Sequence, residues 1–227
     1  RVTKLYSNDG NGGYTEDDTS GVFKGMEFSS IGVADVNGDS APDVVLIGEK
    51  LLNYAPVTHL YINDGSGGFT KNSQSSDENG TFPGLSRGSV NFADIDGDGD
   101  QDLLITGEDS DGNPQTKLYV NDGDGNFTEA GSSEDIRDVR FSSSAFADLD
   151  GDGAMDLVLA GQDSDSGTYA EVYRNDGSGT FTFDQNLKDQ FSISQLVESI
   201  ALGDVDLDGD QDMVVATQGE TYLLIND

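Results

Sequence analysis

The chain has 227 residues, no cysteine and one histidine, and its 44 Asp and Glu outweigh 11 Lys and Arg to give a formal net charge of -33. This charge excludes nucleic acids and anionic membrane surfaces as expected partners, and the lack of cysteine excludes disulfides and thiolate metal sites. No apolar run is long enough for a membrane-spanning helix. The sequence opens on Arg1 without a signal-peptide pattern, as expected of a processed protein or an excised piece.

The first element in chain order is the motif LYSNDGNGGYT, which starts at Leu5 and predicts a strand, a tight hairpin and a return strand. The glycines and Asn/Asp of NDGxG supply the positive φ angles that such hairpins need. The motif recurs as LYINDGSGGFT, LYVNDGDGNFT and VYRNDGSGTFT, and in truncated form as LLIND at the end. We expect the aromatic residue that starts each return strand to pack in the core. These residues are Tyr14, Phe69, Phe127 and Phe181.

An acidic stretch alternates with this hairpin motif. It reads VADVNGDSAPDVVLIG from Val33, FADIDGDGDQDLLITG from Phe92, FADLDGDGAMDLVLAG from Phe146 and LGDVDLDGDQDMVVAT from Leu202. The short apolar runs that end these stretches predict strands buried on both faces. The first aspartates are separated by 59, 54 and 56 residues, so two motifs recur in one phase. This periodicity predicts a repeat protein.

Each repeat has room for four strands and shows no helical periodicity. The expected fold class is therefore all-β, with β-propeller-type blades of four antiparallel strands in about four repeats of roughly 56 residues. We expect a single repeat domain over residues 1–227. It divides into the end of a preceding blade (1–25), repeat 1 (26–84), repeat 2 (85–138), repeat 3 (139–194) and an incomplete repeat 4 (195–227).

Oxygen-bearing side chains stand at alternate positions of each acidic loop. Counted from the first aspartate, positions 1, 3, 5 and 9 carry Asp or Asn, and position 7 can add its backbone carbonyl. Oxygen ligands in this number favour Ca²⁺ over Mg²⁺, which demands a stricter octahedron. We predict about four Ca²⁺ ions, one per loop. The predicted ligands are Asp35, Asn37, Asp39, Ala41 and Asp43; Asp94, Asp96, Asp98, Asp100 and Asp102; Asp148, Asp150, Asp152, Ala154 and Asp156; and Asp204, Asp206, Asp208, Asp210 and Asp212.

An EF-hand loop begins alike but ends with a bidentate Glu at position 12 and enters a helix. Here position 12 lies inside a predicted strand and is Leu46, Ile105, Leu159 or Val215, which argues against an EF-hand. The first loop departs most from the pattern, with Asn37 at position 3 and Ser40 in place of Gly at position 6. We expect it to be the weakest of the four metal sites.

The acidic loop that enters a strand, paired with LYxNDGxGxFT, resembles the FG-GAP/VCBS repeats of integrin α-subunit propellers and of many secreted microbial proteins. The resemblance implies a β-propeller outside the cell, with one Ca²⁺ per loop and usually seven blades. The Gly-Ala-Pro part of the integrin-type pattern is absent, which favours the microbial branch. Only four acidic loops are present, so a seven-bladed ring cannot close from this chain alone.

Catalytic patterns are sparse. GLSRG at 84–88 matches the nucleophile elbow, but a proline precedes it and a predicted strand follows it, so we interpret it as a chance match. His59, the only histidine, lies in a predicted strand and is interpreted as an ordinary strand residue. We therefore expect no enzyme. The N-glycosylation sequons at Asn79 and Asn126 give weak support for secretion and for a glycoprotein.

Two functions stay open at this stage. The first is a non-catalytic, calcium-stabilised extracellular or cell-surface repeat protein that acts as an adhesion or scaffold module or forms filaments. The second is the lectin-like or accessory propeller portion of a larger secreted polysaccharide-acting enzyme. Expected partners are further repeats of a longer chain or copies of this chain, together with a protein or glycan ligand. No nucleic acid and no membrane insertion are expected.

Overall fold

The computed structural model of the protein describes residues 3–17, 22–78, 80–185 and 195–226. Within these ranges the chain forms antiparallel β-sheets, joined by turns and short 3-10 segments such as Ser76–Glu78 and Gly131–Asp135. The expectation of an all-β protein is confirmed.

The strands group into a hairpin and four sheets that follow one another along the chain. The hairpin contains β1 (Leu5–Asn8) and β2 (Tyr14–Asp17). Sheet 1 contains β3 (Met26–Ala34), β4 (Asp43–Lys50), β5 (Pro56–Asn63) and β6 (Phe69–Lys71). Sheet 2 contains β7 (Val90–Ala93), β8 (Asp102–Glu108), β9 (Pro114–Asn121) and β10 (Phe127–Glu129). Sheet 3 contains β11 (Arg140–Ala147), β12 (Asp156–Gln162), β13 (Thr168–Asn175) and β14 (Phe181–Phe183). Sheet 4 contains β15 (Val197–Gly203), β16 (Asp212–Thr217) and β17 (Thr221–Leu224).

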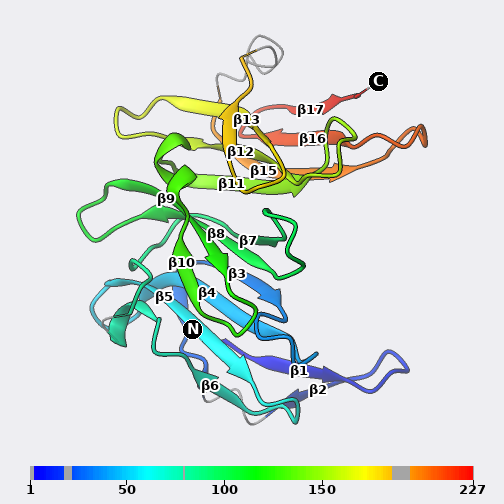
Figure 1. Cartoon of the computed structure of the whole chain (residues 1–227). Helices are drawn as coiled ribbons and strands as arrows, with labels where there is room; N and C mark the ends of the chain where they lie inside the picture. Colours follow the sequence, from blue (N-terminus) through cyan, green and yellow to red (C-terminus); the bar gives the residue numbers. More distant parts are fainter. Residues whose placement is uncertain (1–2, 18–21, 79, 186–194, 227) are drawn as a thin grey trace.

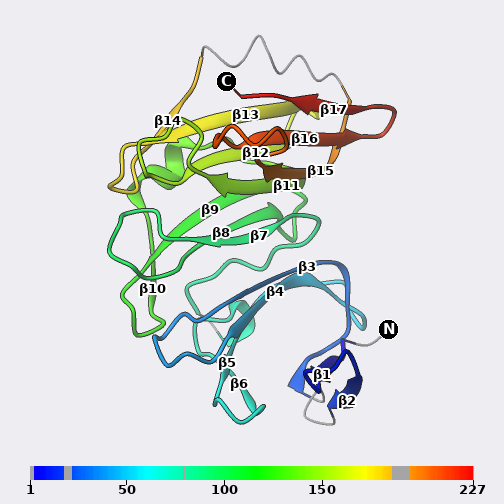
Figure 2. The same cartoon turned by 90° about the vertical axis from the view of Figure 1, so that its right-hand side faces the viewer.

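Each sheet is a simple meander in which neighbouring strands are consecutive in sequence. The sheets succeed one another from the blue end of the chain to the red end (Figure 1). The first strands of the sheets, β3, β7, β11 and β15, lie next to one another and form the inner edge of the stack (Figure 2). The described sheets are consistent with propeller blades, and none of them closes into a barrel.

The hydrophobic core is divided into layers between successive sheets. Val45 and Ile47 of β4 pack against Leu103 and Ile105 of β8 in the layer between sheets 1 and 2. The intervening Val44 and Leu46 point to the other face of sheet 1, where they meet Phe23 and Tyr61. Similar layers lie between sheets 2 and 3 and between sheets 3 and 4. A strand with apolar layers on both sides buries successive residues alternately, which explains the unbroken apolar runs.

The aromatic residues after the hairpin turns behave differently in different repeats. Phe127 and Phe181 are buried as expected, and Phe69 is half-buried. Tyr14 was expected in the core, but 67% of its surface is exposed. Phe127 and Phe181 are buried against the preceding sheet, in clusters that contain Val36 and Ile95, whereas no sheet precedes the β1–β2 hairpin in the described residues.

Candidate metal centres

The acidic loops connect the first two strands of each sheet and are named loop 1 (35–43), loop 2 (94–102), loop 3 (148–156) and loop 4 (204–212). Their last aspartates are almost fully buried at the start of the second strand. The carboxylate of Asp102 accepts the backbone N–H of Ile95 at 2.9 Å and that of Asn121 at 2.8 Å. The carboxylates of Asp43, Asp156 and Asp212 accept the two equivalent N–H groups of their own repeats. The ninth loop residue thus ties the loop to the hairpin strand.

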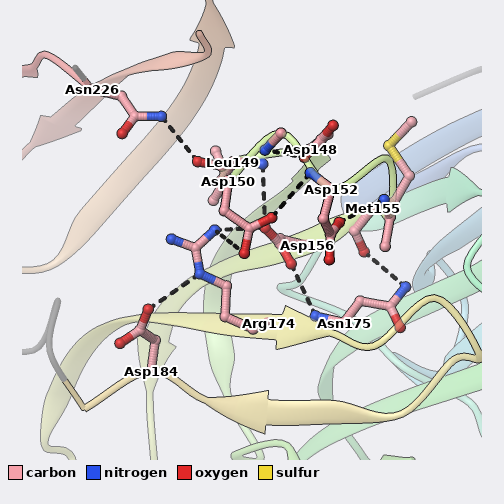
Figure 3. Close-up of polar contacts among 12 residues, drawn as sticks. Asp148, Leu149, Asp150, Asp152, Met155, Asp156, Arg174, Asn175, Asp184 and Asn226 are labelled. Atoms are coloured by element: carbon pink, nitrogen blue, oxygen red, sulfur yellow. Dashed lines mark hydrogen bonds and ion pairs between the residues drawn. The ribbon is translucent and has the colours of Figure 1, made fainter.

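The first aspartate of each loop draws the backbone into a tight curl. In loop 3 the Asp148 carboxylate accepts the N–H of Gly151 at 2.7 Å and that of Gly153 at 3.0 Å (Figure 3). Loops 2 and 4 share this arrangement. In each of these three loops, carboxylate oxygens from positions 1, 3 and 9 all lie within 4.8 Å of one another. The three groups are Asp94, Asp96 and Asp102; Asp148, Asp150 and Asp156; and Asp204, Asp206 and Asp212.

Loop 1 has the same curl but a different donor set. Its position 3 is Asn37, whose side-chain amide donates to Asp39 at 3.0 Å. Positions 3 and 5 therefore contact each other directly, and carboxylates remain at positions 1, 5 and 9. Asp43 accepts the same kind of backbone N–H groups as its equivalents, whereas Asp35 accepts the N–H of position 6 as in the other loops but that of Asp39 at position 5 in place of position 4.

Positions 5 and 7 lie outside the three carboxylate groups. Each position-5 aspartate accepts the backbone N–H of position 7, at 2.8 Å in loops 1 and 3 and 3.0 Å in loops 2 and 4. The position-5 residues are Asp39, Asp98, Asp152 and Asp208, and the position-7 residues are Ala41, Asp100, Ala154 and Asp210. This bond holds the second half of the loop against the first.

Crowding and burial oppose the ionisation of these carboxyl groups. Burial raises the pKa of Asp102 to about 6, and the negative charges of Asp96 and Asp98 add to the effect. Burial, with neighbouring aspartates, also raises the pKa of Asp96 and of Asp43. A bound cation would remove this penalty. The donors are all oxygen atoms, which suit a hard divalent cation, so the loop residues fit a metal ion.

A positive side chain that the sequence analysis did not identify lies beside loop 3. Arg174 of β13 donates to Asp156 at 2.6 Å and lies 3.8 Å from Asp150 (Figure 3). It also pairs with Asp184 at 3.1 Å. The corresponding residues of the other repeats are Ile62, Val120 and Ile225, which carry no charge. The only sequence signal is the R in VYRND, at a position where the other copies of the motif are polar or apolar but uncharged.

The hairpin asparagine links each loop to the next sheet. The Asn175 side-chain amide donates to the Ile95 carbonyl of loop 2 at 2.7 Å, and Asn121 reaches the Val36 carbonyl of loop 1 at 2.9 Å. Asn226 donates to the Leu149 carbonyl of loop 3 at 3.0 Å (Figure 3). The sequence analysis gave these asparagines only a turn-forming role. Their contacts explain why the two motifs recur in phase, because each hairpin closes over the acidic loop of the preceding sheet.

The other residues singled out in the sequence make hydrogen bonds or strand-like contacts with neighbouring residues. His59 is 3% exposed, between the Tyr61 hydroxyl and Asp77, each at 3.1 Å, and its burial lowers its pKa. Ser86 of GLSRG is 2% exposed and bridges to Glu108 in a strand-like pairing, which is not the exposed elbow of a nucleophile. Asn126 hydrogen-bonds to Asp122 within its hairpin, and Asn79 lies outside the described residues.

Stacked antiparallel sheets, three of four strands and one of three in the described residues, with an acidic loop after the first strand of each, define a class of modular repeat protein. The sequence model of the FG-GAP-like repeat matches residues 51–105, 94–159 and 148–215. These matches cover well over half of the chain, so the protein belongs to the FG-GAP-like repeat family. A comparison with curated proteins returned no significant match. In the described part of the chain, no helix has the length and apolar character needed to cross a bilayer.

Proposed function

We propose that this chain is a calcium-stabilised, non-catalytic propeller module that acts outside the cell in adhesion or as a scaffold. In this proposal Ca²⁺ binds in the acidic loops, with loop 1 as the weakest site because it has one carboxylate fewer. The ligands are the twenty loop residues predicted from the sequence. The repeats 26–84, 85–138, 139–194 and 195–227 are its blades, each with one such loop.

One observation carries the proposal. In loops 2, 3 and 4 the position-9 carboxylate of the group accepts a backbone N–H from its own sheet. In loops 2 and 3 a loop carbonyl beside the group also accepts the side-chain amide of an asparagine in the next sheet. A cation in the loop would stabilise the curl that presents the Ile95 and Leu149 carbonyls to the next sheet. Metal binding would thus stabilise contacts between sheets, which is a structural role and requires no reacting group.

Thermal unfolding with and without metal tests the calcium assignment. Saturation at 100 times the dissociation constant stabilises a folded protein by about 2.7 kcal/mol per site. Several occupied sites should raise the melting temperature by roughly 10 °C or more in a domain of this size. We expect this rise in Ca²⁺, its loss in excess EGTA, and a much smaller rise in Mg²⁺. An unchanged melting curve in EGTA would contradict the proposal.

The non-catalytic assignment has a separate test. The isolated chain is incubated with a panel of polysaccharides, with and without Ca²⁺, and reducing ends are measured. We expect no turnover. Turnover that is lost when the loops are disabled would favour the alternative, in which the chain is the propeller portion of a polysaccharide-acting enzyme.

We further propose that the module joins to other repeats, in a longer chain or in neighbouring copies. Apolar side chains are exposed on sheet 1, beside the β1–β2 hairpin, and in or next to the last described strand at the other end of the stack. Ile31 and Val33 of β3 are 56% and 58% exposed, and Leu223 and Ile225 at the other end are 57% and 46% exposed. Equivalent faces inside the stack are covered by the next sheet. Size measurement in Ca²⁺ tests self-joining, and a compact monomer of 24.0 kDa with no tendency to associate would count against it.

A further inference from the structure

Three side chains at equivalent positions of successive repeats meet at the ends of the inner strands that lie away from the acidic loops. Phe28, Arg87 and Phe141 each stand seven residues before the first aspartate of their loop. Their backbones are linked in series. The Arg87 N–H donates to the Phe28 carbonyl at 3.0 Å, and the Phe141 N–H donates to the Arg87 carbonyl at 2.6 Å. Three neighbouring sheets thus hold these residues in a fixed relation.

All three residues have a backbone conformation that bulky side chains rarely adopt. Their φ angles are 49° for Phe28, 54° for Arg87 and 47° for Phe141. The strand register shifts at two of them, between Glu27 and Ser30 and between Arg140 and Ser143. Such local strain costs about 1–3 kcal/mol per residue and is common at binding sites. Here it fixes the direction in which the side chains leave the inner strands.

The two aromatic rings remain open to solvent although they stand at the centre of the stack. Phe28 is 53% exposed and Phe141 is 39% exposed. The Arg87 guanidinium lies 4.0 Å from the centroid of the Phe28 ring and 6.0 Å from that of Phe141, so it orients both rings. A hollow of about 280 Å³ lies over them, with Ser29 and Glu198 also in its lining. Rigid apolar surface with a few polar groups at its rim is typical of a small-ligand site.

The charges around this hollow are matched. Arg87 pairs with Glu49 at 3.1 Å and with Glu108, and Arg140 pairs with Glu108 at 3.2 Å. Two cations thus face two nearly buried carboxylates. An anionic ligand would meet Glu198 and a chain of formal net charge -33, whereas a cationic ligand would meet Arg87. A neutral ligand with an apolar face and hydroxyl groups avoids both conflicts.

We propose that Phe28, Arg87 and Phe141 form a binding site for a neutral pyranose ring of an oligosaccharide or polysaccharide. The apolar face of the sugar packs on the exposed phenyl surface, and its hydroxyl groups hydrogen-bond to Ser29, Glu198 and Arg87 at the rim. The inference deepens the proposed non-catalytic function, on which it rests, by naming the class of ligand that an adhesion module would hold.

Calorimetry and saturation-transfer NMR on the whole chain in Ca²⁺ test the proposal. The probes are the neutral hexasaccharides of cellulose, xylan, laminarin and mannan, with oligogalacturonate as the anionic comparison. We expect at least one neutral probe to bind, and the Phe28→Ala and Phe141→Ala variants to bind it about tenfold more weakly, as the loss of an aromatic packing partner predicts. Tyr54→Ala is the matched control, because Tyr54 is 66% exposed and lies outside the hollow.

Calcium-dependent melting of every sample separates failure of this inference from failure of the proposed function. A normal calcium response without binding of any neutral hexasaccharide would overturn the sugar site alone. Equal weakening by Tyr54→Ala would also overturn it, as would stronger binding of oligogalacturonate than of every neutral probe. Phe28→Leu and Phe141→Leu, which keep apolar volume, allow the test if an alanine variant fails to fold. Loss of self-association in these variants, without any sugar binding, would assign the rings to contacts between copies and contradict the proposal.

Discussion

Loops 2 and 3 have the same aspartates at positions 1, 3, 5 and 9 but balance their charge in different ways. In loop 3, Arg174 donates to Asp156 and lies near Asp150. In loop 2 the equivalent residue is Val120, and burial with neighbouring carboxylates raises the pKa of Asp102. The carboxylates of loop 3 thus have a cationic side chain beside them, whereas the equivalent residue beside loop 2 is uncharged, and we propose that loop 2 relies more on a metal ion from solution. The comparison teaches that the acidic motif specifies which oxygen atoms a loop offers, whereas the surrounding residues set how much unbalanced negative charge the loop carries.

The largest loss of unfolding free energy should follow replacement of the position-9 aspartate, which both loops share. Asp102→Ala and Asp156→Ala each remove an acceptor from two backbone N–H groups. A buried donor without a partner costs about 1–3 kcal/mol, so each variant should lose about 4 kcal/mol of unfolding free energy, in EGTA as well as in Ca²⁺. Asp98→Ala, at the exposed position 5, is the control and should lose stability mainly in Ca²⁺. Chemical denaturation measures both, and a loss for Asp102→Ala confined to Ca²⁺ would contradict the backbone role.

Exchanging Arg174 and Val120, the residues that distinguish the two loops, should change how much Ca²⁺ stabilises each loop. Arg174→Val removes the cation that pairs with the nearly buried Asp156, and breaking such a pair costs about 3 kcal/mol in EGTA. Ca²⁺ should restore most of this loss, so the calcium response of the variant exceeds that of the parent chain. The reciprocal Val120→Arg should reduce the response of loop 2. Calcium titrations of both variants test the pair of expectations, and equal responses in the two would refute the role of Arg174.

Removing the asparagine that links sheets 2 and 3 should lower the unfolding free energy by a smaller amount. Asn175→Ala removes the amide that donates to the Ile95 carbonyl across the boundary between sheets 2 and 3. The same side chain also donates to the Met155 carbonyl and accepts the Gly177 N–H, each at 3.2 Å, so we expect a loss of about 2 kcal/mol together with weaker calcium binding at loop 2. Asn11→Ala, in an exposed hairpin turn, is the matched control and should have little effect. Calcium calorimetry should separate the two variants. A loop 2 affinity unchanged by Asn175→Ala would contradict the coupling.

The pH response of loop 2 should have opposite signs with and without metal. Because the pKa of Asp102 is raised to about 6 in the folded chain, the folded state binds a proton more readily than the unfolded state. In EGTA, lowering the pH from 7 to 5 should therefore add about 1 kcal/mol of stability through Asp102. In Ca²⁺, protons compete with the metal and stability should fall over the same range.

Asp102→Asn isolates this contribution, because it keeps the shape of the side chain but cannot titrate. His59 acts in the opposite direction, since its lowered pKa disfavours the folded state below pH 6.5. His59 is present in both proteins, so its effect cancels in their difference. A pH profile in EGTA that is identical for parent and variant would show that Asp102 does not titrate as described.

The smallest change in stability should come from relieving backbone strain in loops 1 and 4. Leu207 has φ 68° and Ser40 has φ 69°, at positions where other loops have glycine. Leu207→Gly and Ser40→Gly should relieve left-handed strain and raise stability by up to about 1 kcal/mol, with the entropy of glycine offsetting part of the gain. Gly151→Ala, the reverse change at the position of loop 3 that corresponds to Leu207, should be destabilising. Melting temperatures in Ca²⁺ measure all three, and a lower value for Leu207→Gly would contradict the strain argument.

Much of this protein is readable from its sequence because the determining interactions are local and repeated. The NDGxG turns, the apolar runs of β4, β8, β12 and β16, and the alternate oxygens of the acidic loops all depend on neighbours within a few residues. Four repetitions made each pattern stand out from chance. The strands, the meander order and the family follow from these patterns.

Tertiary structure alone decided the rest, because the relevant partners are separated by a whole repeat. Asn175 and Ile95 are 80 residues apart, and nothing in either motif shows that the amide of one meets the carbonyl of the other. Tyr14 stands at the same motif position as Phe127 and Phe181, yet it is exposed, because those two rings pack against a preceding sheet and no such sheet lies before the β1–β2 hairpin in the described residues. The stacking of Phe28, Arg87 and Phe141 likewise requires three sheets to be in place. Local chemistry determined the elements and the donors of each loop, whereas packing between sheets decided which residues they contact.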